Sequence, residues 1–237
     1  MKNKRLKVRE GRIELIVEHK GEDLTFVYPF VGPSTYLDCL SQLRERNLRG
    51  PTLGETVSLL YAAFNSSDKY SEEIKRIMKN NRFFGFTGSL YLPRGEGDYS
   101  NGVIILDNPE IINGRVSMDK KSLVEKLELS DSSVRFIPFG YKTGEQTGGE
   151  LSKNSFILGL VGQEGAEKLA AISDKHSRGL YVWSFKQVND ELTRVSTLGS
   201  LRSLDYGRLV VGGDCWSVSG SNSGYSFGVL DKSAESA

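Results

Sequence analysis

Cysteine and histidine are scarce in this sequence, with two residues of each type among 237. Cys39 and Cys215 lie far apart, and neither belongs to a CxxC or Cys/His cluster, which excludes a disulfide framework and a zinc site. We therefore predict that both cysteines are reduced thiols, and we expect no cofactor and no metal. A site of several histidines is also excluded, whereas a carboxylate-only magnesium or calcium site stays open without any EF-hand spacing.

The sequence also lacks a long apolar run. Its first twenty residues begin basic, but Glu14 and Glu18 interrupt the apolar stretch that follows, and a signal peptide requires that stretch to be unbroken. No other window approaches the roughly 20 apolar residues of a membrane-spanning helix. We therefore expect a cytoplasmic protein with no membrane partner.

A charge imbalance is missing as well, because 31 Lys and Arg residues face 30 Asp and Glu residues, for a net charge of +1. No global field therefore favours nucleic acid or an anionic membrane. Hydrophobic residues make up 38% and charged residues 26% of the chain, which is typical of a folded protein. We predict a single compact domain over residues 1–237, with a possible subdivision into 1–82 and 83–230 and a frayed tail at 231–237.

Period-two patterns at 13–17 and 24–30 predict an N-terminal β-hairpin. Three helices should follow, beginning near Ser34, at a capping box formed by Thr52 and Glu55, and at Ser71. Further along, the pattern predicts a helix that begins at Asp119. Short strands are expected at 84–92, 103–106, 134–139, 192–198, 208–211 and 225–230.

The fold class we predict is α+β, in which the hairpin and helices precede a mixed β-sheet with packed helices. The apolar run Phe156–Val161 reads as a strand, Gln163–His176 as a helix and Leu180–Phe185 as a second strand. These three segments predict one βαβ unit with a parallel, right-handed crossover.

Basic and aromatic residues are interleaved over Lys75–Phe86, where cations could hold phosphates and rings could stack on bases. This pattern suggests weak binding of single-stranded nucleic acid. The same cations at a helix C-terminus would also complement the helix dipole, and the phenylalanines would then enter the core. Together with two aromatic residues near the C-terminus, the candidate binding residues are Arg76, Lys79, Arg82, Phe84, Phe86, Trp216 and Tyr225.

Signals for catalysis are scattered. The turn Gly162–Gly165 has Glu164 in a position that would repel a phosphate, and the polar stretch Gly144–Glu150 lacks the lysine of a nucleotide-binding loop. Cys215 would need an imidazole within reach to act as a nucleophile, and the sequence does not place His19 or His176 beside it.

We therefore expect a non-catalytic binding or interaction module, for which three aromatic and glycine-rich segments, 91–102, 139–149 and 216–225, supply recognition surfaces. The alternative is a hydrolase that uses Cys215 or a carboxylate site, so whether the chain is an enzyme stays open. Its partner is equally open: a macromolecule or a small ligand.

Overall fold

The computed structural model describes residues 5–9, 12–175, 179–200, 209–215 and 223–230. Within them an 11-stranded mixed sheet runs in the order β1-β2-β3-β13-β4-β11-β12-β10-β9, and β5 joins β4 to β8. The strands are β1 (Arg5–Arg9), β2 (Arg12–His19), β3 (Glu22–Ser34), β4 (Arg82–Leu92), β5 (Gly102–Asp107), β8 (Val134–Pro138), β9 (Gly144–Gln146), β10 (Leu180–Trp183), β11 (Leu192–Ser200), β12 (Leu209–Cys215) and β13 (Gly224–Val229), with β6 (Ile111–Ile112) and β7 (Arg115–Val116) forming a separate small hairpin.

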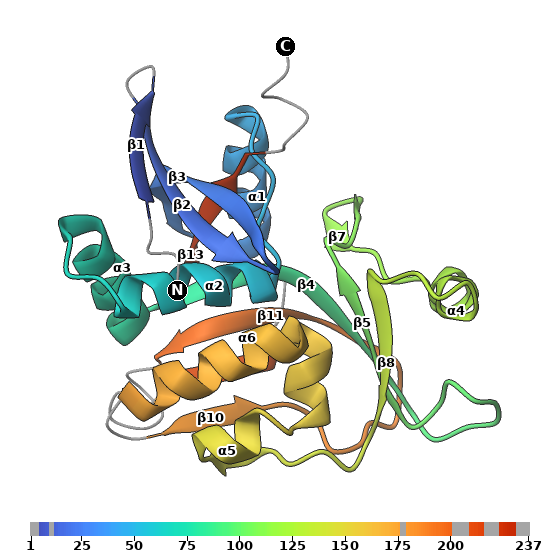
Figure 1. Ribbon diagram of the computed structural model, residues 1–237. Coiled ribbons are helices and arrows are strands. Elements are labelled where there is room, and N and C mark those ends of the chain that lie inside the picture. The colour runs from blue at the N-terminus through green and yellow to red at the C-terminus, as the bar shows by residue number, and fades with distance from the viewer. Residues whose placement is uncertain (1–4, 10–11, 176–178, 201–208, 216–222, 231–237) are drawn as a thin grey trace.

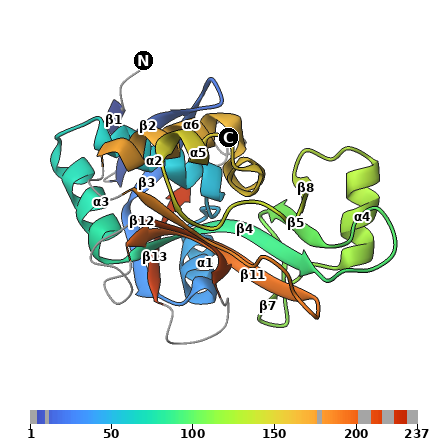
Figure 2. The same ribbon diagram turned by 90° about the horizontal axis from the view of Figure 1, so that it is seen from below.

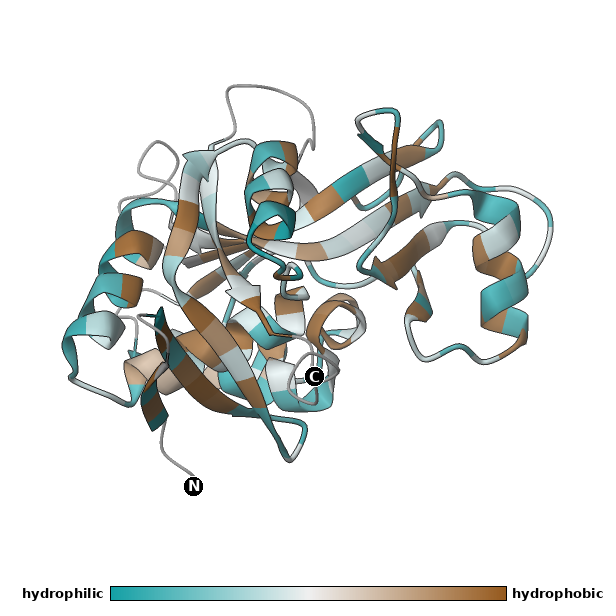
Figure 3. Cartoon of the chain, turned by 90° about the horizontal axis from the view of Figure 1, so that it is seen from above, coloured by the Kyte–Doolittle hydropathy of each residue, from teal (hydrophilic) through white to brown (hydrophobic). Residues whose placement is uncertain are grey.

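Helices cover both faces of this sheet (Figures 1 and 2). Helices α2, α3 and α6 pack on one face, and α1 and α4 contribute to the apolar cluster on the other. The amphipathic pattern is visible in α3 and α4, which carry apolar residues on one side only (Figure 3). The helices are α1 (Tyr36–Glu45), α2 (Leu53–Phe64), α3 (Lys69–Asn80), α4 (Lys120–Glu128), α5 (Gly148–Leu151) and α6 (Ser155–Lys175).

The central strand β4 separates two apolar clusters. Alternate side chains of a strand point to opposite faces, so Phe83 and Tyr91 enter the cluster beneath α2 and α6, while Phe84 and Phe86 enter the cluster beneath α1. All four rings are at most 2% exposed. The sheet is therefore buried on both faces at its centre, and every residue of β4 after Arg82 is buried, including the polar Thr87 and Ser89.

The predicted α+β class and the N-terminal hairpin are confirmed. Strands β2 and β3 pair antiparallel from Ile13 opposite Tyr28 to His19 opposite Glu22. The capping box predicted for α2 is also present, since Thr52 and Glu55 each bond the other's backbone amide. Two other helices begin slightly earlier or later than expected: Thr35 caps α1 and Asp68 caps α3.

The predicted βαβ unit is wrong, because Phe156–Val161 is the first part of helix α6. A short apolar run fits a buried strand and a buried helix equally well. Here Asn154 decides locally, because its side-chain oxygen accepts a hydrogen bond from the Phe156 amide at 3.0 Å. Gly162, with φ 73° and ψ 175°, then bends α6 between its two halves. Parallel strand pairs lie elsewhere, between β10 and β12 and, at one position, between β13 and β4.

The polar segment Gly144–Glu150 contains β9 and the start of α5. Cys39 is a free thiol that is fully buried in α1, and burial raises its pKa to about 12. The side chain of Cys215 lies outside the part of the chain that the structure describes. Within that part, no helix is both long and apolar enough to cross a membrane.

Candidate ligand-binding groove

A groove with a volume of about 510 Å³ opens between the end of α1 and the connection that follows β5. Three separate stretches of the chain line it: the segment from α1 to α2, one ring of β4, and the turn after β5. The lining residues are Leu40, Arg44, Asn47, Leu48, Arg49, Gly50, Phe86, Asn108 and Pro109.

Helix α1 ends in a way that leaves one side of the groove polar. Asn47 adopts a left-handed conformation with φ 54°, a common helix-ending geometry for asparagine. The Leu48 amide then donates back to the Leu43 carbonyl at 2.9 Å, which closes the last turn of α1. Arg44 lies in this last turn of α1, and its exposed side chain is part of the groove lining.

The floor of the groove is Phe86, and a glycine is needed above it. A Cβ atom at Gly50 would lie 2.1 Å from Cδ2 of the Phe86 ring, so no other residue fits there without a shift. On the opposite side, the Asn108 amide donates to the Phe86 carbonyl at 2.7 Å. The segment between α1 and α2 therefore packs on the Phe86 ring, and the turn after β5 is bonded to the backbone of the same residue.

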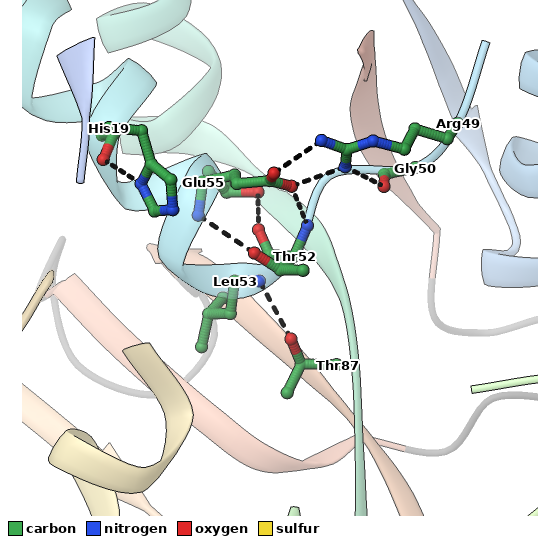
Figure 4. A network of polar contacts seen from close by, with 9 residues as sticks. His19, Arg49, Gly50, Thr52, Leu53, Glu55 and Thr87 are labelled. Carbon is green, nitrogen blue, oxygen red and sulfur yellow. Dashed lines mark hydrogen bonds and ion pairs between the residues drawn. The ribbon is translucent and has the colours of Figure 1, made fainter. Parts of the chain in front are cut away.

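The lining residues carry two cations and no carboxylate. The exposed Arg44 forms no ion pair with any described residue. Arg49 is held instead by Glu55, which accepts from Nη1 at 2.7 Å and from Nη2 at 2.6 Å (Figure 4). A fork-like pair of this kind fixes the guanidinium plane as well as its position.

Glu55 anchors the groove to helix α2. Its carboxylate also accepts a hydrogen bond from the Thr52 amide at 2.8 Å, while its own amide donates to the Thr52 hydroxyl at 3.2 Å (Figure 4). Burial opposes ionisation of Glu55, but the hydrogen bonds and charge of Arg49 outweigh it and lower the pKa of this carboxyl. One carboxylate therefore caps α2 and orients a groove arginine.

A second polar cluster lies behind Glu55. Ser58 Oγ is 2.9 Å from His19 Nδ1 and 2.9 Å from Lys168 Nζ, so it joins the end of β2, the middle of α2 and the second half of α6. Lys168 also pairs with Glu164, whose carboxylate accepts from the Lys20 amide at 2.8 Å. Because Ser58 is only 2% exposed, we interpret this cluster as a tie between elements.

The proton arrangement of this cluster favours a neutral His19. An ammonium group can only donate, so Ser58 Oγ accepts from Lys168 and its own proton is available to Nδ1 of an unprotonated imidazole. Burial lowers the pKa of His19 below its ordinary value of 6.5; the charge of Glu55 opposes this effect and the charge of Lys168 adds to it. If His19 were protonated, its Nδ1–H and the Lys168 ammonium would both donate to Ser58 Oγ, and the serine proton would lose its acceptor.

Stability should therefore fall as the pH drops below 6.5. The folded protein binds fewer protons at His19 than the unfolded chain, so the stabilisation is present above 6.5 and is lost as the pH falls through the lower, folded pKa. We expect a loss of about 1 kcal/mol, the value of one hydrogen bond. Urea unfolding at pH 7.5 and 5.5 measures this loss of stability.

In His19→Gln the loss of stability between the two pH values should shrink. An unchanged pH dependence would contradict the assignment of the effect to His19, because only His176 would then remain as the titrating histidine.

The structure separates the residues predicted to bind nucleic acid. Arg76 and Lys79 are exposed on α3, where Arg76 pairs with Glu73 at 3.7 Å, whereas Phe84 and Phe86 are 0% and 2% exposed. The two rings are thus buried in the core rather than available to stack on bases. Binding of phosphate groups by Arg76, Lys79 and the half-buried Arg82 stays a prediction.

The remaining candidates are dispersed. Tyr225 is half-buried in β13 and packs edge-on against Phe30, with ring centroids 5.3 Å apart. Trp216 and His176 lie outside the described residues, as does the side chain of Cys215, so a Cys/His pair stays untested. The turn Gly162–Gly165, once placed between a strand and a helix, lies within α6. Among the residues the structure covers, no group of three or more His, Cys, Asp or Glu side chains could hold a metal ion.

Sequence reasoning found Phe86 but missed Arg44, Arg49, Asn47 and Asn108. The available signal was weak: an arginine in the last helical turn followed by asparagine and Gly50-Pro51 also describes an ordinary helix end. No family model, no curated protein and no solved structure matches this chain, so the groove geometry has to carry the functional argument.

Proposed function

We propose that this protein is a non-catalytic binding protein that holds a small anionic ligand in the groove between α1 and the turn after β5. The observation that carries this proposal is the exposed guanidinium of Arg44, which stands beside the Glu55-paired guanidinium of Arg49 in a lining without a carboxylate of its own. Arginine presents several N–H donors in a planar fork, which suits carboxylate, sulfonate and phosphate groups.

The size and remaining chemistry of the groove support a small ligand. Its volume of about 510 Å³ falls within the range of small-molecule sites. Leu40 supplies a half-buried apolar surface, with Leu48, Phe86 and Pro109 buried beneath it, and the exposed side-chain amides of Asn47 and Asn108 supply further donors. A ligand that combines an anionic group with a flat apolar body would use both kinds of surface.

The lining offers little for catalysis. None of its nine residues is a histidine, cysteine, serine, aspartate or glutamate. A nucleophile and a base have to meet at one point in a covalent mechanism, and a general acid or base has to reach the substrate. This composition supports binding over turnover in the groove, and the hydrolase alternative based on Cys215 would require a different site.

A pair of dyes that differ in charge tests the proposal. Titration with the anionic 1-anilinonaphthalene-8-sulfonate should show saturable fluorescence, whereas the uncharged N-phenyl-1-naphthylamine should bind much more weakly. Arg44→Glu should weaken binding of the anionic dye at least about tenfold, because a charge-assisted hydrogen bond of roughly 1.5–3 kcal/mol becomes a repulsion.

Arg115→Glu is the matched control, since Arg115 is also exposed but lies on β7 outside the groove lining. Binding in this variant should equal that of the original protein. Equal binding of the two dyes, or equal losses in Arg44→Glu and Arg115→Glu, would remove the groove as an anion site. Far-UV and near-UV circular dichroism of each variant should be unchanged, because dye binding also reports loosened packing.

A further inference from the structure

Among the residues that the structure describes, strand β1 is an edge strand of the sheet. Within the described residues it pairs with β2 alone, and Figure 1 shows it at the outer edge of the molecule. Leu6 is 45% exposed and Val8 is 73% exposed, which makes them two of the most exposed large apolar side chains described. An unpaired edge offers a row of backbone N–H and C=O groups to an incoming strand.

The apolar face of the sheet continues past its covered part at this edge. Leu6 lies opposite Leu15, and Val8 lies opposite Ile13. Leu15 is fully buried in the core beneath α2, and Ile13 packs against the same cluster. Because directly opposite residues share a face, Leu6 and Val8 extend this core surface by one further strand and leave it open.

The other face of β1 is basic. Arg5 and Lys7 alternate with the two apolar residues and therefore point the opposite way. Both are exposed; Arg5 forms an ion pair with Asp23, and Lys7 lies opposite Glu14. Glu14 is only 2% exposed and is already paired with Arg12 at 3.2 Å, so the charge of Lys7 is not shared with an accessible carboxylate at this position.

This charge pattern discriminates between occupants of the edge. A second copy that paired antiparallel in full register would set Lys7 opposite Lys7, and a parallel copy would align each cation with its equivalent. Like charges directly opposite each other destabilise a strand pair. A lysine in an edge strand is also a known device against self-association. The edge therefore disfavours a second copy of this chain and favours an acidic strand.

We propose that β1 is a docking edge for an extended acidic segment of a partner protein, which adds to the sheet as a further strand. Its carboxylates face Arg5 and Lys7, its alternate apolar residues cover Leu6 and Val8, and backbone hydrogen bonds supply the register-independent part of the affinity. This surface is separate from the groove and does not depend on the function proposed for it.

Fluorescence anisotropy with two labelled peptides tests this docking edge. The peptide Glu-Val-Glu-Leu-Glu, flanked by glycines, should bind, and its counterpart Lys-Val-Lys-Leu-Lys should not. Lys7→Glu should weaken binding of the acidic peptide about fivefold or more, because an attractive cross-strand pair becomes repulsive, and should strengthen binding of the basic peptide, because a repulsive pair becomes attractive. A reciprocal change of this kind cannot arise from a general loss of structure.

Lys121→Glu, an exposed position in α4, is the matched control and should leave both affinities unchanged. Amide hydrogen exchange should show new protection at β1 on addition of the acidic peptide. The proposal is overturned if the acidic peptide fails to bind, if the two lysine variants behave alike, or if sedimentation shows a dimer that Lys7→Glu alters, since a second copy would then occupy the edge.

Discussion

Glu55→Ala should lower the free energy of unfolding by about 3 kcal/mol. The change removes half of the α2 capping box, which contributes about 1 kcal/mol. It also leaves Arg49, whose side chain is 30% exposed, without the carboxylate that holds it at 2.6 and 2.7 Å. A partly buried cation without its partner adds roughly 2 kcal/mol, less than a fully buried one because solvent still reaches it. Urea unfolding at pH 7 measures the difference.

Glu150→Ala supplies a matched control within the same chain. Glu150 occupies the same place in the capping box of α5, where Thr147 is the N-cap and Lys142 is the ion-pair partner. Both charged side chains of that pair are exposed, at 53% and 44%, so the loss should be much smaller than for Glu55. Equal losses in the two variants would show that the cap alone matters, and that the burial of the Arg49–Glu55 pair contributes nothing.

Gly162→Ala should cost about 2 kcal/mol, because the backbone at this position has φ 73° and ψ 175°, a region that is essentially restricted to glycine. A Cβ atom at Gly162 would meet nothing within 4 Å, so the cost comes from the backbone alone. The bend matters for packing: it separates Phe156 and Leu160 in the first half of α6 from Lys168, which reaches Ser58, in the second.

Gly149→Ala in helix α5 is the control for this second variant. A Cβ atom there also meets nothing within 4 Å, and its φ is not in the range that side chains avoid. Alanine should therefore stabilise the protein by roughly 0.5 kcal/mol through the lower entropy of the unfolded chain. Thermal and urea unfolding of both variants give the comparison. A Gly162→Ala protein as stable as the original would mean that α6 straightens without loss of packing.

Local sequence signals predicted the elements whose ends are set by their own residues. The capping box at Thr52 and Glu55 and the alternation on either side of the Lys20-Gly21 turn act over a few residues, so they can be recognised without the rest of the chain. The run Phe156–Val161 had no such internal signal. Its helical state depends on a cap from Asn154 and on a close approach to the sheet at Gly159, where a Cβ atom would lie 2.7 Å from Ile137 and 2.8 Å from Ile105.

The local sequence pattern also did not predict which side chains of this basic and aromatic segment are exposed. The residues from Lys75 to Phe86 formed a plausible basic and aromatic surface, because sequence distance alone places the cations beside the rings. In the folded chain Arg76 faces solvent from α3, while Phe84 and Phe86 turn into the core beneath α1. The change from helical to extended backbone at Asn81 sends the two groups in different directions.

The sequence by itself determined the α+β class, the N-terminal hairpin, the capped start of α2 and the extended backbone of most of β4, since hydrophobic period and capping chemistry are local. The tertiary structure alone decided the groove and the open edge of β1. The groove joins Arg44 and Arg49 to Phe86 and Asn108 across long stretches of chain, and their approach depends on sheet order and helix packing. Such long-range contacts produce no periodic pattern in the sequence, because each of these residue types is also common in an ordinary helix end or turn.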